Sequence, residues 1–460
     1  MRDSALFGRG NLPAEWEITS PDFVPLANSF FSYQEVMKIY LDIVGCRLNQ
    51  AEIERYARQF RSQGHTLVPS PAEADLAVLN TCDVTSAAAS DSRHKTRQIN
   101  RAGTPEVFLT GCWATLNPET AASLPGVTRV ISNEEKDDLV PNLLDIPPEK
   151  FDLEPIQRQP VPGARLRTRA FIKAQDGCHN QCTFCITTVA RGSARSRTIA
   201  EIVADIQAVS EGATKEAVLT GVHLGSWGFD LSPKLKLADL VRAALKHTSL
   251  PRLRLSSVEP WDLDADFYRL WEDPRLCRQL HLPLQSGSAP VLKRMARQVS
   301  PREYRNIVET ARQAVPDMAI TTDIITGFPG ESEAEFSESL DYIREMNFAG
   351  GHVFTYSARP GTPAARLPEQ VPHPVRKARN EQVRGVLESS SREYRARFVG
   401  SSLPVLWENA AGLGPDGWQV SGLTDNYLRV FAHTNEDVWN QITNVKLVRR
   451  NERGLVGEIL

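Results

Sequence analysis

The sequence predicts an α/β protein built from a parallel α/β domain, a partial barrel of six strand–helix units, and a small C-terminal β-barrel. Across residues 37–150 and 164–392, short apolar strands alternate with helical patterns, which is typical of parallel sheets. Across residues 395–460, short β-type segments separated by turns replace this alternation. With 460 residues, 41% of them hydrophobic and 24% charged, the chain is long enough for several domains with their own cores.

The first 36 residues show no clear periodicity and contain several Pro, Ser and Phe residues. We therefore expect residues 1–36 to be an N-terminal extension and the folded part to begin near Met37. The segment lacks the cationic and apolar parts of a signal peptide, and no apolar run in the chain is long enough to span a bilayer. We expect a cytoplasmic location.

Three predicted strands of the first domain end in a cysteine, and helical patterns follow over residues 49–60 and 86–101. The strands are residues 38–46 with Cys46, 76–82 with Cys82, and 107–112 with Cys112. Because the carboxyl ends of parallel strands meet at one edge of a sheet, we expect these cysteines to converge. Cysteine is also a common buried residue, but the chain contains only 7, which favours a shared iron–sulfur cluster.

The second domain follows a proline-rich stretch, residues 141–165, which predicts a linker. Six strands, each followed by a helical pattern, predict an open, partial barrel with its active site at the carboxyl ends of the strands. These strands are residues 169–173, 216–221, 253–257, 281–284, 319–325 and 351–356.

The loop after the first of these strands carries Cys178, Cys182 and Cys185 in the spacing C-x3-C-x2-C. Three thiolates can hold a cubane iron–sulfur cluster and leave its fourth iron open, where a small molecule can bind and receive an electron. A zinc knuckle is the alternative, with His179 as the fourth ligand. Zinc prefers four closed ligands, usually in C-x2-C pairs, and His179 lies beside Cys178, which would strain the geometry.

Other strand-end loops of this domain are rich in glycine and polar residues, at 220–223, 285–288 and 326–331. Each satisfies ordinary turn chemistry, but together, on one face beside a cluster, they favour a cofactor cleft that includes Gly221 and Ser286. The odd, low cysteine count argues against a secreted disulfide framework, and we interpret Cys277 as a packing residue.

Nucleic-acid binding is not signalled by the whole chain, whose net charge is −3, so it would need local patches. The candidate basic patches are Arg165/Arg167/Arg169, Arg191/Arg195/Arg197, Arg392/Arg395/Arg397 and Lys446/Arg449/Arg450/Arg453. The predicted strands of the C-terminal barrel, residues 403–408, 417–422, 427–431 and 445–448, offer a further set. Its candidates for RNA contact are Trp418, Asn426, Tyr427 and Arg429, although Trp and Tyr also serve as core residues.

These features together resemble the radical S-adenosylmethionine (SAM) methylthiotransferases over roughly residues 37–460. Two cysteine triads match the family in order and context, and further motifs resemble the branch that acts on N6-threonylcarbamoyladenosine in tRNA. The matching motifs are residues 44–50, 80–85, 219–225, 256–260 and 352–357.

The resemblance implies a TIM-like radical SAM core, an RNA-binding TRAM barrel at the C-terminus, and two 4Fe-4S clusters with SAM as cofactors. Cys178, Cys182 and Cys185 would hold the cluster that cleaves SAM, with Phe184 against the adenine. Cys46, Cys82 and Cys112 would hold an auxiliary cluster that carries the sulfur.

In such enzymes a 5′-deoxyadenosyl radical removes hydrogen from C2 of the adenine, and the methylthio group joins that carbon. The expected partners are the tRNA anticodon stem-loop, a sulfur donor, and an electron donor such as flavodoxin or ferredoxin. Glu259, at a strand end, is predicted to contact the threonylcarbamoyl group or SAM, unless it pairs with a nearby arginine.

Two other functions stay open from the sequence. One is a sibling enzyme that methylthiolates isopentenyladenosine in tRNA. The other is a non-catalytic, metal-stabilised RNA-binding protein, which would not cleave SAM; two cysteine triads without an obvious fourth ligand count against it.

Overall fold

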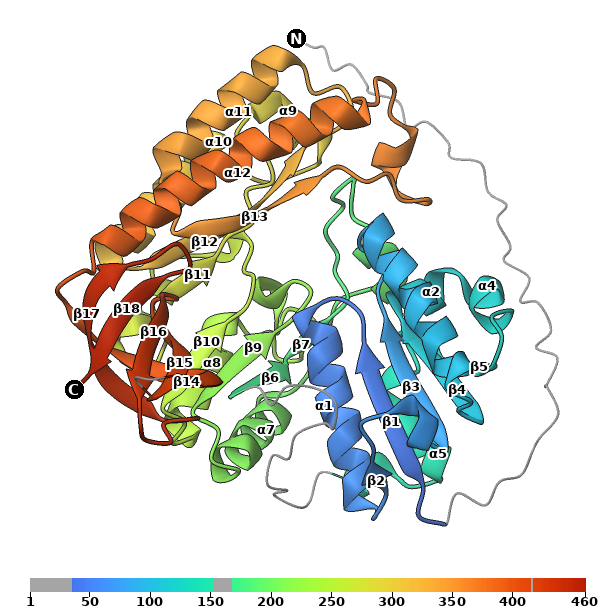
Figure 1. Cartoon of the computed structure of the whole chain (residues 1–460). Helices are drawn as coiled ribbons and strands as arrows, with labels where there is room; N and C mark the ends of the chain where they lie inside the picture. The colour runs from blue at the N-terminus through green and yellow to red at the C-terminus, as the bar shows by residue number, and fades with distance from the viewer. Residues whose placement is uncertain (1–34, 152–167, 415–416) are drawn as a thin grey trace, which may run out of the picture. The chain divides into compact units, whose positions relative to one another are not determined.

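The computed structural model describes residues 35–151, 168–414 and 417–460 (Figure 1). Within them, residues 36–460 form one compact unit. Most of the predicted N-terminal extension lies outside the described residues, as do Arg165 and Arg167. None of the described helices is both long and apolar enough to cross a membrane.

The first part of the chain is a five-stranded parallel sheet in the order β2-β1-β3-β4-β5. Its strands are β1 (Lys38–Ile43), β2 (Thr66–Leu67), β3 (Leu76–Thr81), β4 (Glu106–Gly111) and β5 (Val127–Val130). Its helices are α1 (Arg47–Ser62), α2 (Ser86–Arg101), α3 (Cys112–Leu116), α4 (Pro118–Ala122) and α5 (Leu139–Leu144).

The three predicted strands of this sheet are β1, β3 and β4, which are neighbours at its centre. All six residues of β3 are buried, which explains its continuous apolar run. The edge strands β2 and β5 were not predicted, because two residues in one and an exposed Thr–Arg pair in the other carry little pattern. The linker prediction is wrong at its start, since α5 occupies residues 139–144 and buries Pro141.

The second part contains the six predicted parallel strands in two groups, β10-β9-β6 and β11-β12-β13. Parallel bridges at Leu253–Leu276 and Ser257–His281 connect the groups into one curved sheet. The strands are β6 (Arg169–Lys173), β9 (Glu216–Thr220), β10 (Arg252–Leu255), β11 (Gln279–His281), β12 (Ala319–Thr326) and β13 (Gly350–Thr355). A short antiparallel pair, β7 (Gln175–Asp176) and β8 (Arg195–Ser196), flanks the second cysteine loop.

Helices separate these strands along the chain and cover one face of the sheet. They are α6 (Thr187–Arg191), α7 (Ile199–Glu211), α8 (Leu237–His247), α9 (Ala289–Arg294), α10 (Pro301–Ala314), α11 (Glu333–Met346) and α12 (His373–Ala396). Reciprocal capping boxes fix the starts of three of them, at Thr198 with Glu201, Ser300 with Glu303, and Ser332 with Glu335. The apolar core between sheet and helices leaves the opposite face of the strands free for polar side chains.

The third part is a closed barrel in the order β14-β15-β16-β18-β17, as the sequence predicted in outline. Its strands are β14 (Ser402–Gly414), β15 (Gly417–Thr424), β16 (Arg429–Thr434), β17 (Ile442–Arg450) and β18 (Leu455–Ile459). Helix α12 continues to Ala396, so the barrel begins only after it. The guanidinium of Arg252 on β10 donates to the carbonyls of Pro404 and Leu423, at 2.7 and 3.0 Å, and joins the barrel to the second part.

Candidate active site

The three cysteines of the first part lie at one edge of the sheet, where neighbouring strands end. Cys46 follows β1 and precedes α1, Cys82 directly follows β3, and Cys112 opens α3 after β4. Burial raises the pKa of the Cys82 thiol to about 12, and Cys46 and Cys112 add smaller contributions in the same direction. The three cysteines therefore follow the carboxyl ends of neighbouring strands, and that they hold one cluster together stays a prediction.

Two glycines let the backbone approach this edge closely. Gly45 has a φ of +103°, and a Cβ there would lie 2.6 Å from the Cβ and Sγ of Cys82. Gly111 has a φ of +90°, and a Cβ there would lie 2.3 Å from the carbonyl oxygen of Thr81. Only glycine fits both positions, because a side chain would meet a sterically disfavoured backbone and an occupied space.

The second cysteine group lies in the loop between β7 and α6 and has donors directed at its sulfurs. The backbone N–H of Asn180 donates to Cys178 Sγ at 3.3 Å, and the guanidinium of Arg297 donates to Cys182 Sγ at 3.6 Å. Burial raises the pKa of the Cys182 thiol to about 11, against the opposing effect of Arg297. Hydrogen bonds to ligand sulfurs are a feature of iron–sulfur sites, so this donor set fits a cluster.

Arg297 is a site residue that the sequence did not reveal. It forms a two-pronged pair with Glu259, at 2.5 and 3.0 Å, and donates to the carbonyl of Pro283 at 2.8 Å. Its guanidinium also lies over the ring of Trp261, 4.6 Å from the centroid. Glu259 therefore has the arginine partner that was the alternative to a ligand contact.

His223, in the predicted loop at 220–223, lies between the second cysteine group and an aspartate. Its Nε2 is 2.7 Å from Asp262 Oδ2, and its Nδ1 is 3.9 Å from Cys178 Sγ. Burial lowers the pKa of His223, but the hydrogen bonds to Asp262 and Cys178 raise it to about 10.

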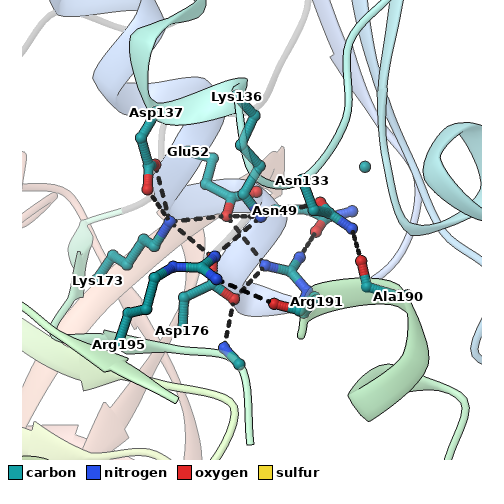
Figure 2. A network of polar contacts seen from close by, with 12 residues as sticks. Asn49, Glu52, Asn133, Lys136, Asp137, Lys173, Asp176, Ala190, Arg191 and Arg195 are labelled. Atoms are coloured by element: carbon teal, nitrogen blue, oxygen red, sulfur yellow. Dashed lines mark hydrogen bonds and ion pairs between the residues drawn. The ribbon is translucent and has the colours of Figure 1, made fainter. Parts of the chain in front are cut away.

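A buried network of charges connects the two cysteine-bearing parts (Figure 2). Its carboxylates are Glu52 on α1, Asp176 on β7 and Asp137, and its cations are Lys136, Lys173 on β6 and Arg191 on α6. Five of the six side chains are buried, whereas Asp137 is 38% exposed and also lies 3.9 Å from Arg55. Pairing of opposite charges offsets the cost of burying them. We call this set the buried ion network.

Arg191 is the central donor of the buried ion network, with a side chain only 1% exposed. It donates to Asp176 at 2.9 Å, Glu52 at 3.1 Å and Asn49 Oδ1 at 2.7 Å (Figure 2). Asn49 Oδ1 also accepts from Cys46 Sγ at 3.6 Å. One guanidinium, six positions after Cys185, thus reaches the surroundings of the other cysteine group.

The buried ion network shifts the pKa of its own carboxylate Glu52 and that of the nearby Cys112 thiol. Burial would raise the pKa of Glu52, but Lys136, Arg191 and Lys173 hold it far below its ordinary range. Burial raises the pKa of Cys112, and Arg191 and Lys136 oppose that shift. Cationic groups around buried thiols favour the thiolate, which is the form that binds iron.

Comparisons with known proteins assign both cysteine-bearing parts of the chain to protein families. Residues 172–343 match the Radical SAM superfamily, and residues 38–132 match a family described as Uncharacterized protein family UPF0004. The threonylcarbamoyladenosine tRNA methylthiotransferases MtaB of Bacillus subtilis and Thermotoga maritima are 32% and 34% identical to this chain. These matches cover 88% and 89% of this chain and 92% and 94% of the relatives.

The chain belongs to the radical SAM methylthiotransferase family. A further relative, the tRNA-2-methylthio-N(6)-dimethylallyladenosine synthase of Clostridium tetani, is 30% identical over 91% of this chain and 95% of its own. The solved structure of the radical SAM methyltransferase TsrM from Kitasatospora setae has the same fold in outline, with a TM-score of 0.53 and 14% identity. It covers 72% of this chain and 77% of that one. Membership implies a 4Fe-4S cluster and SAM as cofactors.

Three other residues of this methylthiotransferase, Phe184, Gly221 and Ser286, were predicted to contact the cofactor, and each has different neighbours. Phe184 packs against an apolar group that includes Met295 and Phe328. A Cβ at Gly221 would come within 3.0 Å of Gln175 Oε1, so the backbone there approaches another loop closely. Ser286 is 1% exposed, and its hydroxyl accepts from Ser288 N–H and donates to Ser339. Their contacts with SAM stay predictions. Cys277 is buried, as expected of a packing residue.

Two of the predicted RNA contacts of the methylthiotransferase are wrong because their side chains are buried in interior contacts. Arg191 is inside the buried ion network, and Asn426 is 0% exposed. Tyr427 accepts a hydrogen bond from Arg47 at 3.1 Å and lies under the guanidinium of Arg254.

Several remaining basic candidates have acidic partners in the structure. Arg169 and Arg429 both pair with Glu408, at 2.7 and 2.5 Å. Arg197 pairs with Asp205 and Arg397 with Asp317. Exposed candidates without an acidic partner in the described part of the chain are Trp418, Arg195, Arg392, Lys446, Arg449, Arg450 and Arg453.

Proposed function

We propose that this methylthiotransferase adds a methylthio group to C2 of N6-threonylcarbamoyladenosine next to the anticodon of tRNA. The observation that carries the proposal is that the two segments with cysteine triads, each of which follows the carboxyl ends of strands, belong to parts of the chain joined by the buried ion network. The substrate is taken from the threonylcarbamoyladenosine relatives, which are 32–34% identical to this chain. The sibling reaction on isopentenyladenosine is the second candidate, favoured by relatives at 30–32%.

In this proposal Cys178, Cys182 and Cys185 hold the radical-generating cluster, and Cys46, Cys82 and Cys112 hold an auxiliary one. When bound, the two 4Fe-4S clusters and SAM supply the 5′-deoxyadenosyl radical and the sulfur that an unreactive aromatic C–H requires.

The residues of the chain bind and position these groups. Arg297 and the N–H of Asn180 donate to the sulfurs of the second triad, and Arg297 holds Glu259 in place. Arg191 extends from α6 to Asn49, beside Cys46, and so joins the segments that carry the two triads. Radical transfer needs short, fixed distances between reacting groups, which a rigid network of buried ion pairs supports.

The proposed macromolecular partner is the anticodon stem-loop of tRNA. The target base must leave its stack to enter the site, as in other base-modifying enzymes. The exposed cations at the end of α12 and on β17, with Trp418 on β15, offer phosphate and stacking contacts for the surrounding strand. A sulfur donor and a low-potential electron donor such as flavodoxin or ferredoxin complete the reaction, which we place in the cytoplasm with its tRNA.

Metal analysis tests the two-cluster part of the proposal. We expect about eight irons per chain in anaerobically purified protein and about four in a Cys46/Cys82/Cys112→Ala variant. Equal iron in both proteins would contradict an auxiliary cluster, and zinc in place of iron would contradict the enzymatic mechanism.

Substrate analysis tests the reaction itself. The reconstituted enzyme, supplied with SAM, a reductant and sulfide, should convert an anticodon stem-loop bearing threonylcarbamoyladenosine to its 2-methylthio form, as measured by mass spectrometry of the nucleosides. Conversion of the isopentenyladenosine stem-loop alone would support the sibling function instead.

A further inference from the structure

A group of polar side chains lies on the face of the second sheet that does not pack on the helices. It consists of His281 on β11, Thr321 and Asp323 on β12, and His352 on β13. Ile324 and Val353, which alternate with these residues along the strands, point into the core with the helices. We call this group the lumen cluster.

The lumen cluster is held by its own hydrogen bonds but leaves one acceptor unused. His281 Nε2 lies 3.2 Å from Asp323 Oδ2, and His281 Nδ1 lies 3.0 Å from Thr321 Oγ1. Asp323 Oδ1 is buried and has no hydrogen-bond partner among the described residues. A carboxylate oxygen without a donor is costly, so Asp323, whose side chain is 25% exposed, has acceptor capacity left for a ligand donor.

The same face presents an exposed imidazole and an exposed phenyl ring beside that oxygen. His352 is exposed, and its ring centroid lies 6.4 Å from that of His281 and 6.3 Å from that of Phe354. Phe354 is 42% exposed, although large aromatic side chains are usually covered. The imidazole of His352, the ring of Phe354 and the partly exposed carboxylate of Asp323 therefore share one open side.

The lumen cluster lies directly below the second cysteine loop. Asp323 and His352 are register partners, and the next pair on the same face is Ile325 with Phe354. Two residues along a strand span about 6.6 Å. Ile325 packs, together with Phe184 of the cysteine loop, against one apolar group. Arg297, Glu259 and His223 are the polar groups at the cysteine loop itself, and the lumen cluster is the next polar group along β12 and β13 on the same face.

We infer that the lumen cluster binds the polar substituent on N6 of the target adenine, a group with ureido N–H, hydroxyl and carboxylate functions. The Asp323 carboxylate accepts from a ureido N–H or the hydroxyl, His352 donates to the carboxylate of the substituent, and Phe354 covers the base. This inference rests on the proposed function. An isopentenyl substituent has no hydroxyl or carboxylate and, apart from the N6–H that both bases carry, no donor for Asp323, so the cluster selects against it.

The test compares two stem-loops, one with threonylcarbamoyladenosine and one with isopentenyladenosine, in the same reconstituted enzyme. The measured quantity is the ratio of their kcat/KM values for methylthiolation. Both substrates are assayed with the same enzyme preparation, so the fraction of enzyme that is folded and carries its clusters cancels from this ratio. Asp323→Asn and His352→Phe should each lower this ratio at least about tenfold. His94→Phe, an equivalent change at an exposed position on α2, is the matched control and should leave the ratio unchanged.

The outcomes separate the two proposals. If wild-type enzyme prefers the threonylcarbamoyl stem-loop and both variants keep that preference within about twofold, the lumen cluster is not the recognition site. If wild-type enzyme acts only on the isopentenyl stem-loop, the proposed function fails and the inference fails with it. Because His352 is exposed, a variant there keeps the test valid even if Asp323→Asn does not fold.

Discussion

Replacing Arg191 by methionine removes the central donor of the buried ion network and should lower the free energy of unfolding by about 3–5 kcal/mol. The side chain is 1% exposed and donates to Asp176, Glu52 and Asn49. After the substitution the buried carboxylates Glu52 and Asp176 lose one of their three cationic partners, and one of the remaining two lysines, Lys173, is shared with Asp137, which is partly exposed and also pairs with Arg55. Methionine fills a similar length, so lost packing contributes little and the main cost is electrostatic.

Anaerobically purified protein is unfolded with urea, and circular dichroism monitors the unfolding and gives its free energy. The matched control is Arg195→Met, because Arg195 is exposed and donates only to the Arg191 carbonyl, at 3.3 Å, within the described part of the chain. It should change the free energy of unfolding by less than about 0.5 kcal/mol. Glu52→Gln combined with Arg191→Met removes one charge of each sign and should cost less than the sum of the single changes. Equal stability of Arg191→Met and Arg195→Met would refute the reasoning.

Three further predictions follow from individual contacts. Gly111→Ala places a Cβ 2.3 Å from the Thr81 carbonyl and should cost about four irons per chain, whereas Gly385→Ala, in open space on α12, should keep them, as measured by iron analysis. Arg297→Lys keeps the charge but loses the two-pronged pair with Glu259, and should slow 5′-deoxyadenosine formation at least about tenfold. Arg197 and Arg58 lower the pKa of Asp205 against its burial, so its contribution to stability is full above the unfolded pKa of about 3.9 and is lost as the pH falls toward the folded value. Asp205→Asn should therefore flatten the acid side of a stability–pH curve measured by urea unfolding.

A contrary result in any of these three experiments would contradict the structural reason given for it. Full iron in Gly111→Ala would mean that the edge of the first sheet tolerates a side chain. Normal SAM cleavage in Arg297→Lys would reduce Arg297 to a packing role, and an unchanged acid limb in Asp205→Asn would separate that ion pair from folding stability.

The sequence predicted the strands well where their apolar patterns are continuous. Strand β3, with six buried residues, and helix α2 agree closely with their predicted ranges, whereas β18 and the short edge strands were missed. The arginine-rich stretch after the second cysteine group was interpreted as an RNA patch, but Arg191 is buried. Local sequence does not distinguish a buried arginine from an exposed one, because the partners of Arg191, Glu52 and Asn49, are 139 and 142 positions away along the chain.

The sequence by itself determined the chemistry of this protein and its order of domains. The spacing of Cys178, Cys182 and Cys185 is local, and cysteines at successive strand ends converge because parallel strands share an edge. Only the tertiary structure decided which charges are buried, that Arg297 holds Glu259, and that His281, Asp323 and His352 share one face. Those contacts join residues far apart in the chain, and their energies depend on desolvation and geometry that a linear pattern does not contain.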